Sequence, residues 1–443
     1  MDNGGALKSG ANIAVIGGGP AGSFFAILAL KIAREMGKDI NILIFDCKHF
    51  SDHGPRGCNM CAGVIQDSLI RKLERIGITL PSDIRMADIE GYAFHLKGFS
   101  ACIKKDPSTS IYSVFRGGGP YRWAMIPRRK VSFDQYLLDH AIKEGVKFRY
   151  ERVSGIEFPK MDGNKVSVIC KGKNNSKVYE ADFVVGAFGV NTVLIKKLPF
   201  GYRPPKMWIS CQAEIEMERD HLREKCSNMI HIFFTRSPKI KYLAITPKGD
   251  NATITAIGKN VSLNDLQNEI INSEISGYLP SNWEFTCHCH PKLPVTPAQQ
   301  PYTDRCVMIG DASYSRYMKN GIESAYYTAL FAAETILKNG ISKEILKRDY
   351  DKRCRKMFYY DNLAGKILFL LHEIISSNDV SSTVYLDRVI NEQSQMEPEK
   401  QEVSRLLWHL YTGDMPYQYI LKRFLNPLLH AQFTYETIKK IFR

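Results

Sequence analysis

Two short groups of cysteines and histidines have the side chains best suited to chemistry in this sequence. The first is the pair Cys58 and Cys61 in the stretch GPRGCNMCAGVIQ, and the second is the run CHCH at residues 287–290. Such groups can bind zinc when four ligands converge. The run CHCH follows WEFT and is expected to be a strand, in which alternate side chains point to opposite faces. Its four side chains cannot all reach one metal ion, so we expect no metal site.

Several roles remain open for the thiols of Cys58 and Cys61. They could be simply packed, could form a redox disulfide, or could place one sulfur beside a bound substrate. A disulfide scaffold is not expected, because the 11 cysteines follow no regular spacing. The opening segment MDNGGALKSG has neither the basic nor the apolar part of a secretory signal, so we expect reduced thiols and a cytoplasmic protein.

A glycine-rich turn near the start of the chain predicts a dinucleotide site. Residues 13–16 are typical of a short buried strand, and the turn GGGPAG at 17–22 leads into a long apolar helix. Glycines permit the tight turn and a close approach to a pyrophosphate, whose charge the helix N-terminus stabilises. A second strand ends in an acid that can accept hydrogen bonds from an unphosphorylated ribose. The predicted binding residues are Gly17, Gly19, Pro20, Ala21, Gly22 and Asp46.

A second segment indicates which dinucleotide is bound. In DRCVMIGDASYSRYMKNGIESAYYTAL, a buried strand at 306–309 leads to Gly-Asp-Ala, and a helix follows a later glycine. Together the two segments resemble the fingerprints of glutathione-reductase-type flavoproteins, which include aromatic hydroxylases and geranylgeranyl reductases. The resemblance implies FAD, with the aspartate on the ribityl chain and backbone amides at the pyrimidine end of the flavin, where a helix N-terminus stabilises negative charge. The implied binding residues are Gly310, Asp311, Asn320, Gly321 and Ile322.

Two further segments are similar to the FAD-binding part of this family. RRKVSFDQYLLDHAIKEGVKF at 128–148 matches a basic residue followed by Phe-Asp and a helix, which implies that Lys130 or a neighbouring arginine contacts FAD. ADFVVGAFGVNT at 181–192 corresponds to a hydroxylase segment that reads Asp-Gly. Here Phe188 replaces that aspartate before Gly189, a further implied FAD contact, and this difference counts against a conventional NADPH-dependent hydroxylase.

The cysteine segment has a counterpart in geranylgeranyl reductases, whose Cys-x-Gly motif matches Cys61-Ala62-Gly63. The resemblance implies that Arg56, Ala62 and Gly63 contribute to FAD binding, and that Cys61 lines the cavity opposite the flavin. KIKYLAITPKGDNATITAIG at 239–258 resembles the family's cavity-lining strand pair. The candidate catalytic residues are Cys61, Tyr242 and Lys248, and Cys58 has no assigned role.

The sequence departs from the family just before the last FAD helix. Where Pro-x-x-Gly-x-Gly-Ile is usual, this chain has SRYMKNGI, with Arg316 in place of the proline and Lys319 in place of the first glycine. The two cations could hold an anionic group or a negatively charged flavin. Alternatively, both could extend into solvent.

The positive charge of the chain is concentrated in its middle. Residues 96–260 contain 29 basic and 15 acidic residues, which accounts for the whole net charge of +14. This surplus favours an anionic partner such as a membrane surface or a phosphorylated ligand, although a solvated basic face fits equally well. We recognise no nucleic-acid-binding motif and therefore expect no nucleic acid partner. No apolar run reaches the roughly 18 to 20 residues that span a bilayer.

These features predict an α/β protein with three parts. A Rossmann-like, three-layer FAD-binding domain is expected from residues 10–95, 127–192 and 300–345, with an inserted antiparallel-sheet substrate domain from 96–126 and 193–299. A helical C-terminal region is expected from 346–443, interrupted at Pro427. It could cover the FAD domain, cap a hydrophobic tunnel or lie on a membrane.

The expected activity is that of an FAD-dependent oxidoreductase that saturates C=C bonds of an isoprenoid or other lipid-like substrate by hydride transfer from reduced flavin. Two alternatives are an FAD-dependent monooxygenase of a hydrophobic substrate and a lipid-binding protein that keeps the flavin fold without catalysis. The electron donor is left open between NADPH, NADH and ferredoxin, so a reductase or ferredoxin partner is included. We expect a cytoplasmic protein with peripheral contact at the inner face of a membrane.

Overall fold

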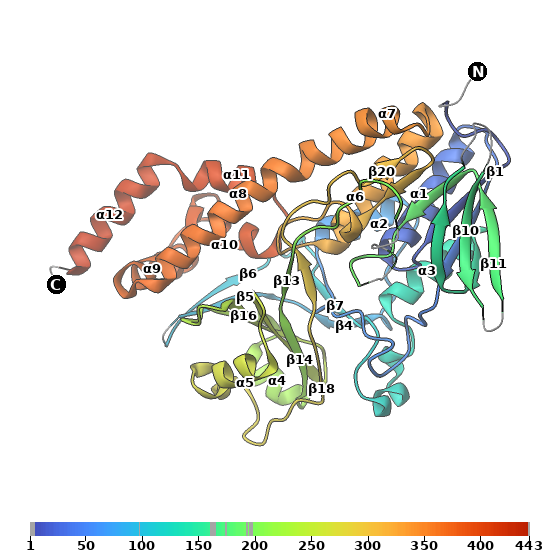
Figure 1. Ribbon diagram of the computed structural model, residues 1–443. Helices are drawn as coiled ribbons and strands as arrows, with labels where there is room; N and C mark the ends of the chain where they lie inside the picture. Colours follow the sequence, from blue (N-terminus) through green and yellow to red (C-terminus); the bar gives the residue numbers. More distant parts are fainter. Residues whose placement is uncertain are drawn as a thin grey trace.

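Two sheets and a group of C-terminal helices make up the molecule (Figure 1). The computed structural model describes residues 5–96, 98–159, 165–172, 175–191, 194 and 198–441. The two termini lie at opposite ends, with the parallel sheet near the N-terminus and the helices α8 to α12 extending away from it. The second sheet lies below both parts in this view.

The first sheet has six strands in the order β20-β21-β12-β1-β2-β8, and every pair is parallel except β20 with β21. Its central strands are almost entirely buried apolar residues, as a parallel sheet covered on both faces requires. The strands are β1 (Ala11–Ile16), β2 (Ile40–Asp46), β8 (Lys147–Tyr150), β12 (Phe183–Gly186), β20 (Tyr302–Thr303) and β21 (Cys306–Met308).

Both faces of this sheet are covered, which confirms the predicted three-layer fold. Helices α1 (Pro20–Glu35), α3 (Phe133–Lys143) and α6 (Gly321–Glu334) form one hydrophobic core with it. The opposite face packs against an antiparallel sheet of three strands, which contributes Ile156, Val166 and Val168 to a second core. These strands are β9 (Val153–Glu157), β10 (Val166–Lys171) and β11 (Ser176–Ala181).

The second large sheet has seven strands in the order β18-β14-β17-β16-β15-β5-β6, and its pairs are antiparallel except β15 with β5. The strands are β5 (Gly91–Leu96), β6 (Phe99–Lys104), β14 (Cys211–Glu216), β15 (Met229–Phe233), β16 (Ile240–Pro247), β17 (Asn251–Gly258) and β18 (Cys287–Cys289). Helices α4 (Arg219–Cys226) and α5 (Leu263–Ile271) pack against it. Smaller pairings join β3 (Val64–Ile65), β7 (Tyr112–Val114) and β4 (Arg85–Asp88), and β13 (Met207–Ile209) with β19 (Lys292–Pro294).

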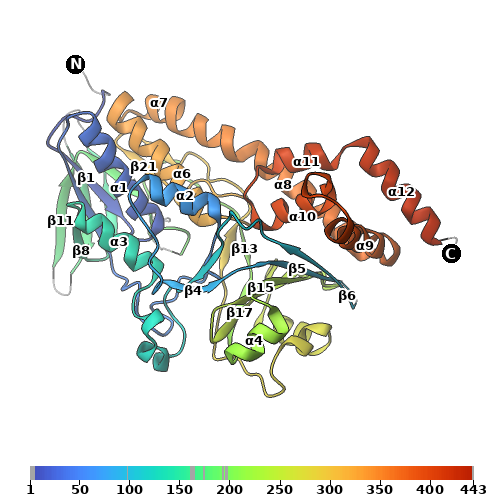
Figure 2. The ribbon, with the colours of Figure 1, turned by 180° about the vertical axis from the view of Figure 1, so that it is seen from behind.

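The C-terminal helices pack against the other face of this second sheet, as the view from behind shows (Figure 2). They are α8 (Lys352–Ser377), α9 (Asp379–Gln395), α10 (Glu402–Thr412), α11 (Tyr417–Phe424) and α12 (Pro427–Ile441). The short helix α7 (Lys343–Ile345) precedes them. Helix α2 (Asp67–Arg75) lies in the N-terminal half and contributes to the core of the first sheet. The helical character of the C-terminal region and the break at Pro427 are confirmed. No helix in the described part of the chain is both long and apolar enough to cross a membrane.

One predicted boundary needs correction. Strand β5 forms a hairpin with β6 and pairs with β15, so residues 91–95 belong to the seven-stranded sheet and not to the FAD-binding part. The boundary at residue 95 cut this hairpin, because nothing in its local sequence shows which sheet it joins. The other domain boundaries stay predictions.

Candidate active site

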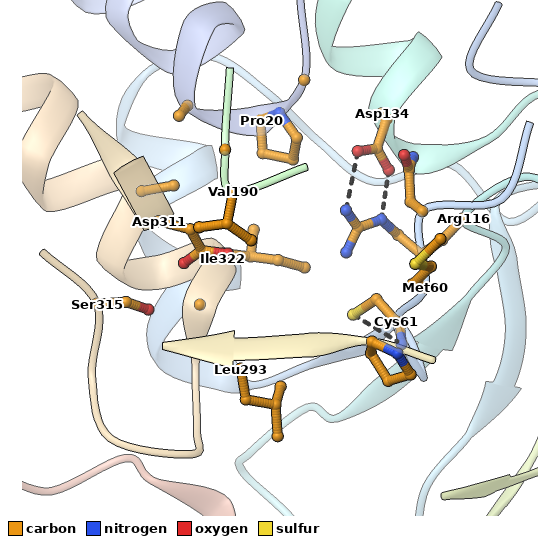
Figure 3. A pocket seen from close by; sticks show the side chains of 18 of the residues that line it. Pro20, Met60, Cys61, Arg116, Asp134, Val190, Leu293, Asp311, Ser315 and Ile322 are labelled. Atoms are coloured by element: carbon orange, nitrogen blue, oxygen red, sulfur yellow. Dashed lines mark hydrogen bonds and ion pairs between the residues drawn. The ribbon is translucent and has the colours of Figure 1, made fainter. Parts of the chain in front are cut away.

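A large cavity of about 760 Å³ connects the parallel sheet to the seven-stranded sheet. It begins at the carboxyl ends of β1 and β2, the place where parallel α/β sheets bind ligands. Figure 3 shows Asp311 and Ile322 on one side of it and Cys61 and Arg116 on the other, with Leu293 of β19 nearby. The cavity therefore joins the predicted dinucleotide turn to the predicted substrate sheet.

The dinucleotide turn has the tight geometry that its glycines predict. Gly17 has φ +111°, and a Cβ on it would lie 2.4 Å from the carbonyl oxygen of Ala187. The amide of Gly18 donates a hydrogen bond of 2.7 Å to Oδ2 of Asp46, and the amide of Lys48 donates to Oδ1 at 2.9 Å. Burial raises the pKa of Asp46, although these amides act against it. The aspartate is thus fixed beside the turn and still lines the cavity.

The distal segment supplies a carboxylate, Asp311, with one oxygen that lacks a partner, although the carboxylate also accepts a hydrogen bond from Ser315. Asp311 lines the cavity, and no described residue hydrogen-bonds to its buried Oδ1. Burial raises the pKa of this carboxyl. Asn320, with φ +50°, leads into the start of α6, where Gly321 leaves the approach to the helix N-terminus open. A free acceptor beside an accessible helix N-terminus fits the hydroxyl-bearing chain and the pyrimidine ring of FAD.

Most of the predicted site residues line this one cavity. They are Gly17, Gly19, Pro20, Ala21, Asp46, Cys61, Ala62, Gly63, Gly189, Tyr242, Asp311, Asn320, Gly321 and Ile322. Gly22 and Gly310 do not line it, because they hold the α1 turn closely packed. A Cβ on Gly22 would lie 1.9 Å from the Gly17 carbonyl oxygen, and one on Gly310 would lie 2.9 Å from Ala21 Cβ.

Three predicted residues lie elsewhere. Arg56 and Lys130 are exposed and line neither this cavity nor the second one described below. Arg129 beside Lys130 is buried, but it stacks on Trp123 and donates a hydrogen bond of 2.6 Å to Asp250. Lys248 belongs to the second cavity, where its Nζ lies 3.5 Å from Oε1 of Glu214. The three candidate catalytic residues therefore do not face one cavity.

A buried cation that does line the first cavity is Arg116, which the sequence analysis did not indicate. Its guanidinium forms a two-point ion pair with Asp134 in the first turn of α3, with Nη2 and Oδ1 2.8 Å apart (Figure 3). Arg116 lines both cavities. The only signal in the sequence was an arginine before the three glycines of FRGGGP, a pattern without a known binding context.

A second cavity of about 560 Å³ lies on the other side of the Cys58–Cys61 segment. Four cysteines line it, namely Cys58, Cys61, Cys287 and Cys289. In β18 the cysteines are half-buried and the histidines exposed, as strand alternation predicts. Among the described residues, no three His, Cys, Asp or Glu side chains are arranged to hold a metal ion.

The thiol of Cys58 is acidic in this setting. A hydrogen bond with Cys289, the amide of Met60 at 3.3 Å and the charge of Lys48 together lower the pKa of Cys58 to about 6, although burial opposes them. Cys61 is different, because it lines both cavities and its sulfur accepts a hydrogen bond of 3.4 Å from the amide of Gly63.

We expect iodoacetamide to modify Cys58 at pH 6.5 about as fast as at pH 8, because the thiolate already predominates above pH 6. Mass spectrometry of tryptic peptides after short labelling times would measure this. Replacing Cys289 by alanine removes the largest cause of the low pKa, so labelling at pH 6.5 should slow about tenfold. Equal rates in the two proteins would show that Cys289 does not activate the thiol.

The two cations before α6 have different surroundings, and neither simply extends into solvent. The guanidinium of Arg316 donates to the carbonyl oxygens of Gly413 and Met415 and lies 3.4 Å from Asp361. Arg316 therefore joins the segment before α6 to α8 and to the loop between α10 and α11. Both residues line the first cavity, but no described residue forms a hydrogen bond or ion pair with Lys319.

Comparison with known proteins identifies the fold family. The FAD binding domain family matches residues 11–282, which is more than half of the chain. The chain belongs to this family. FAD is its cofactor, and the protein is an FAD-dependent oxidoreductase.

Individual relatives are distant. An uncharacterized protein of Methanosarcina barkeri is 23% identical over 369 residues, which cover 79% of this chain and 82% of that protein. A geranylgeranyl bacteriochlorophyll reductase-like protein from Thermoplasma acidophilum has a TM-score of 0.66 at 15% identity, covering 94% of this chain and 98% of that one. The p-nitrophenol 4-monooxygenase of Pseudomonas putida has a TM-score of 0.54 at 12% identity, covering 94% and 98%. At these identities the structures share the fold with this protein.

Proposed function

We propose that this FAD-dependent oxidoreductase saturates C=C bonds of a hydrophobic, isoprenoid-like or lipid-like substrate. The observation that carries the proposal is the continuity of the cavity. The dinucleotide turn and Asp311 line one end, and apolar side chains from the seven-stranded sheet line the other. The side chains from this sheet are Tyr92, Ile230, Ile232, Tyr242, Ala244 and Ile257, and Leu293 of β19 adds to them.

The residues of this chain have separable tasks in such a reaction. FAD, when bound, supplies the hydride. Gly17, Asp46 and Asp311 would hold the cofactor, and the apolar end would exclude water and bind the hydrocarbon. The likeness to a geranylgeranyl reductase-like fold and the matched Cys61-Ala62-Gly63 segment favour this branch of the family. Cys61 remains the candidate thiol beside the substrate.

Anaerobic mixing of the reduced holoenzyme with an unsaturated isoprenoid tests the proposal. We expect the flavin to be reoxidised in step with loss of a double bond, measured by visible absorbance and by a mass gain of two hydrogens in the extracted lipid. A reduced flavin that no unsaturated isoprenoid or fatty-acyl compound reoxidises would reject the proposal.

A monooxygenase is the competing function, because the p-nitrophenol 4-monooxygenase shares the fold. The presence of Phe188 before Gly189, where hydroxylases have aspartate, counts against it. Rapid mixing of the reduced protein with oxygen distinguishes the two. A long-lived peroxyflavin spectrum would support the monooxygenase, whereas rapid return to oxidised flavin without it favours the reductase. Reduction by NADPH, NADH or reduced ferredoxin in the same apparatus would identify the donor.

We further propose that α8 contacts an anionic membrane surface. Six large apolar side chains along this helix are exposed, and five of them, from Tyr360 to Ile374, follow the spacing of one helical face. They are Tyr359, Tyr360, Leu363, Ile367, Leu370 and Ile374. Lys352 and Lys356 of the same helix are also exposed, which suits a negatively charged surface.

Replacing Leu370 and Ile374 together by glutamate is expected to reduce binding to vesicles of phosphatidylglycerol and phosphatidylcholine by about tenfold or more, because two apolar side chains are lost from the contact. Co-sedimentation measures the bound fraction. Ile271→Glu in α5 is the matched control, since Ile271 is exposed to the same 56% as Leu370. Unchanged binding by the double variant would rule out this face.

A further inference from the structure

Lys319 is a cation inside the cavity without a counterion from the protein. Its Nζ lies 5.1 Å from the ring centre of Tyr242 and 5.0 Å from that of Tyr411, and these rings pack edge to face. No described residue forms a hydrogen bond or ion pair with it. The nearby carboxylates are engaged elsewhere, because Asp361 pairs with Arg316 and Glu323 pairs with Lys72 at 2.7 Å.

A second polar group in the same place also lacks a partner. Tyr411 lines the cavity and is 1% exposed, yet its hydroxyl makes no hydrogen bond to a described residue. A buried hydroxyl normally has a partner, since leaving it unpaired costs free energy. Two unpaired donors on one cavity wall therefore indicate a ligand that supplies an acceptor.

The backbone around Lys319 is also unusual. Met318 and Asn320, on either side of it, have φ of +59° and +50°. The left-handed region is unfavourable for a bulky side chain such as methionine, and such conformations are concentrated at functional sites. This geometry directs the lysine between the two tyrosine rings.

We propose that Lys319 and Tyr411 form an oxygen-binding subsite that selects substrates whose C=C bond is conjugated to a carbonyl or carboxylate group. The proposal rests on the reductase function above and defines its substrate class. An isolated alkene is a poor hydride acceptor, whereas a conjugated one can pass the incoming charge to oxygen. In an apolar cavity, two donors on that oxygen stabilise the charge strongly.

The reaction balances with a reduced flavin as the reductant. The substrate accepts a hydride at the carbon β to the carbonyl, and the π electrons of the C=C bond move to give an enolate. Lys319 and Tyr411 hold the enolate oxygen by hydrogen bonds. A proton from water then adds to the α carbon, so that two C–H bonds replace one π bond and the flavin is left oxidised.

Proton uptake gives a signature of the subsite. Burial, and to a lesser extent the charge of Arg316, lowers the pKa of Lys319 to about 7, so most of the lysine is neutral above that pH. A bound carboxylate favours the ammonium form and draws in a proton. The other titratable groups around it are Tyr242 of β16, Tyr411 of α10, Asp361 and His372 of α8, and Glu323 of α6. Burial raises the pKa of the tyrosines and of Asp361 and lowers that of His372 to about 4. Asp361 pairs with Arg316 and Glu323 with Lys72, and the tyrosines and His372 stay neutral at pH 8.

Calorimetric titration of the oxidised holoenzyme with farnesoic acid and farnesol tests the proposal, because the two probes share a hydrocarbon chain and differ in the conjugated carboxylate. Lys319→Met should weaken farnesoic acid binding about 10- to 100-fold and Tyr411→Phe about 2- to 10-fold. Farnesol binding should change less than about threefold. Titration at pH 8 in two buffers of different ionisation enthalpy should show proton uptake that Lys319→Met abolishes. Lys366→Met is the control, since Lys366 also lies over a tyrosine ring, that of Tyr317, but outside the cavity.

Farnesoic acid that fails to bind the wild-type holoenzyme, or that binds Lys319→Met and Tyr411→Phe as tightly as wild type, would overturn the subsite. The proposed function fails separately. If farnesoic acid binds through Lys319 but neither it nor any other alkene reoxidises the reduced flavin, the subsite stands and the reductase activity does not. If alkenes reoxidise wild type and Lys319→Met equally, the reductase stands and the subsite does not.

Discussion

Replacing Gly17 by alanine is expected to yield a protein that is purified without FAD and unfolds at a markedly lower temperature. The new Cβ would lie 2.4 Å from the carbonyl oxygen of Ala187, and the backbone has φ +111°, which alanine rarely adopts. Because the obstructing atom is backbone, no side-chain rotation relieves the overlap. Gly17 must shift away from the end of β12, and the turn that faces the cofactor shifts with it. The loss in free energy of unfolding should be about 3 kcal/mol or more.

Gly37→Ala is the matched control for this prediction. Gly37 also has a positive φ of +64°, but no atom lies within 4 Å of a Cβ placed there. It should lose only about 1 kcal/mol and keep its FAD. Calorimetric unfolding and visible flavin absorbance of the two variants separate backbone strain from steric overlap. Full flavin content in Gly17→Ala would show that the tight turn does not position the cofactor.

The dinucleotide end of the site was predictable because its determinants are local. Gly17 to Gly22 combine a strand, a turn and a helix N-terminus within a few residues, and Asp46 follows at the end of the next strand. Asp311 and Gly321 share this property at the end of β21 and the start of α6. Periodicity and turn chemistry are therefore sufficient to place these residues at one end of a parallel sheet.

The substrate end was less predictable because its residues meet only through long-range packing. Tyr411 comes from the C-terminal helices and reaches Lys319 and Tyr242, which are far away in sequence. Periodicity predicted that this region is helical, but not that α10 contributes a side chain to the cavity. Lys248 shows the opposite error. A motif match placed it among the catalytic candidates, whereas it lies in the turn between β16 and β17 and its side chain contacts Glu214 in the other cavity.

Cys58 and Cys61 of the CxxC stretch show the same contrast between local sequence signals and long-range packing. The resemblance predicts that Cys61, and not Cys58, lies beside the substrate; in the structure Cys61 lines both cavities and Cys58 lines the second. The surroundings of Cys58 could not be predicted, because Cys58 lies in a loop and its partner Cys289 lies far away in the sequence, on β18 of the seven-stranded sheet. The segment between them forms the wall shared by the two cavities, and Arg116 belongs to the same wall.

Removing the partner of Arg116 is expected to have the second large effect. Asp134 is 1% exposed and Arg116 is 7% exposed, so Asp134→Ala would leave a buried guanidinium without its carboxylate. Breaking a buried ion pair in this way should lower the free energy of unfolding by about 3–5 kcal/mol. Asp134→Asn, which keeps the shape but not the charge, should fall between wild type and Asp134→Ala. Urea unfolding of wild type, Asp134→Asn and Asp134→Ala measures the three free energies of unfolding. Equal stability of Asp134→Ala and wild type would contradict a structural role for the ion pair.

The double variant Arg116→Met/Asp134→Leu distinguishes a structural arginine from one that also holds the cofactor. Replacing both partners by apolar side chains removes the unpaired charge, so the double variant should be more stable than Asp134→Ala. Stability and flavin content need not recover together, because Arg116 lines both cavities while Asp134 anchors it to α3. If the guanidinium also contacts FAD, the double variant will fold well and still lose flavin during gel filtration. If it retains flavin, the ion pair serves only to fix the wall between the cavities.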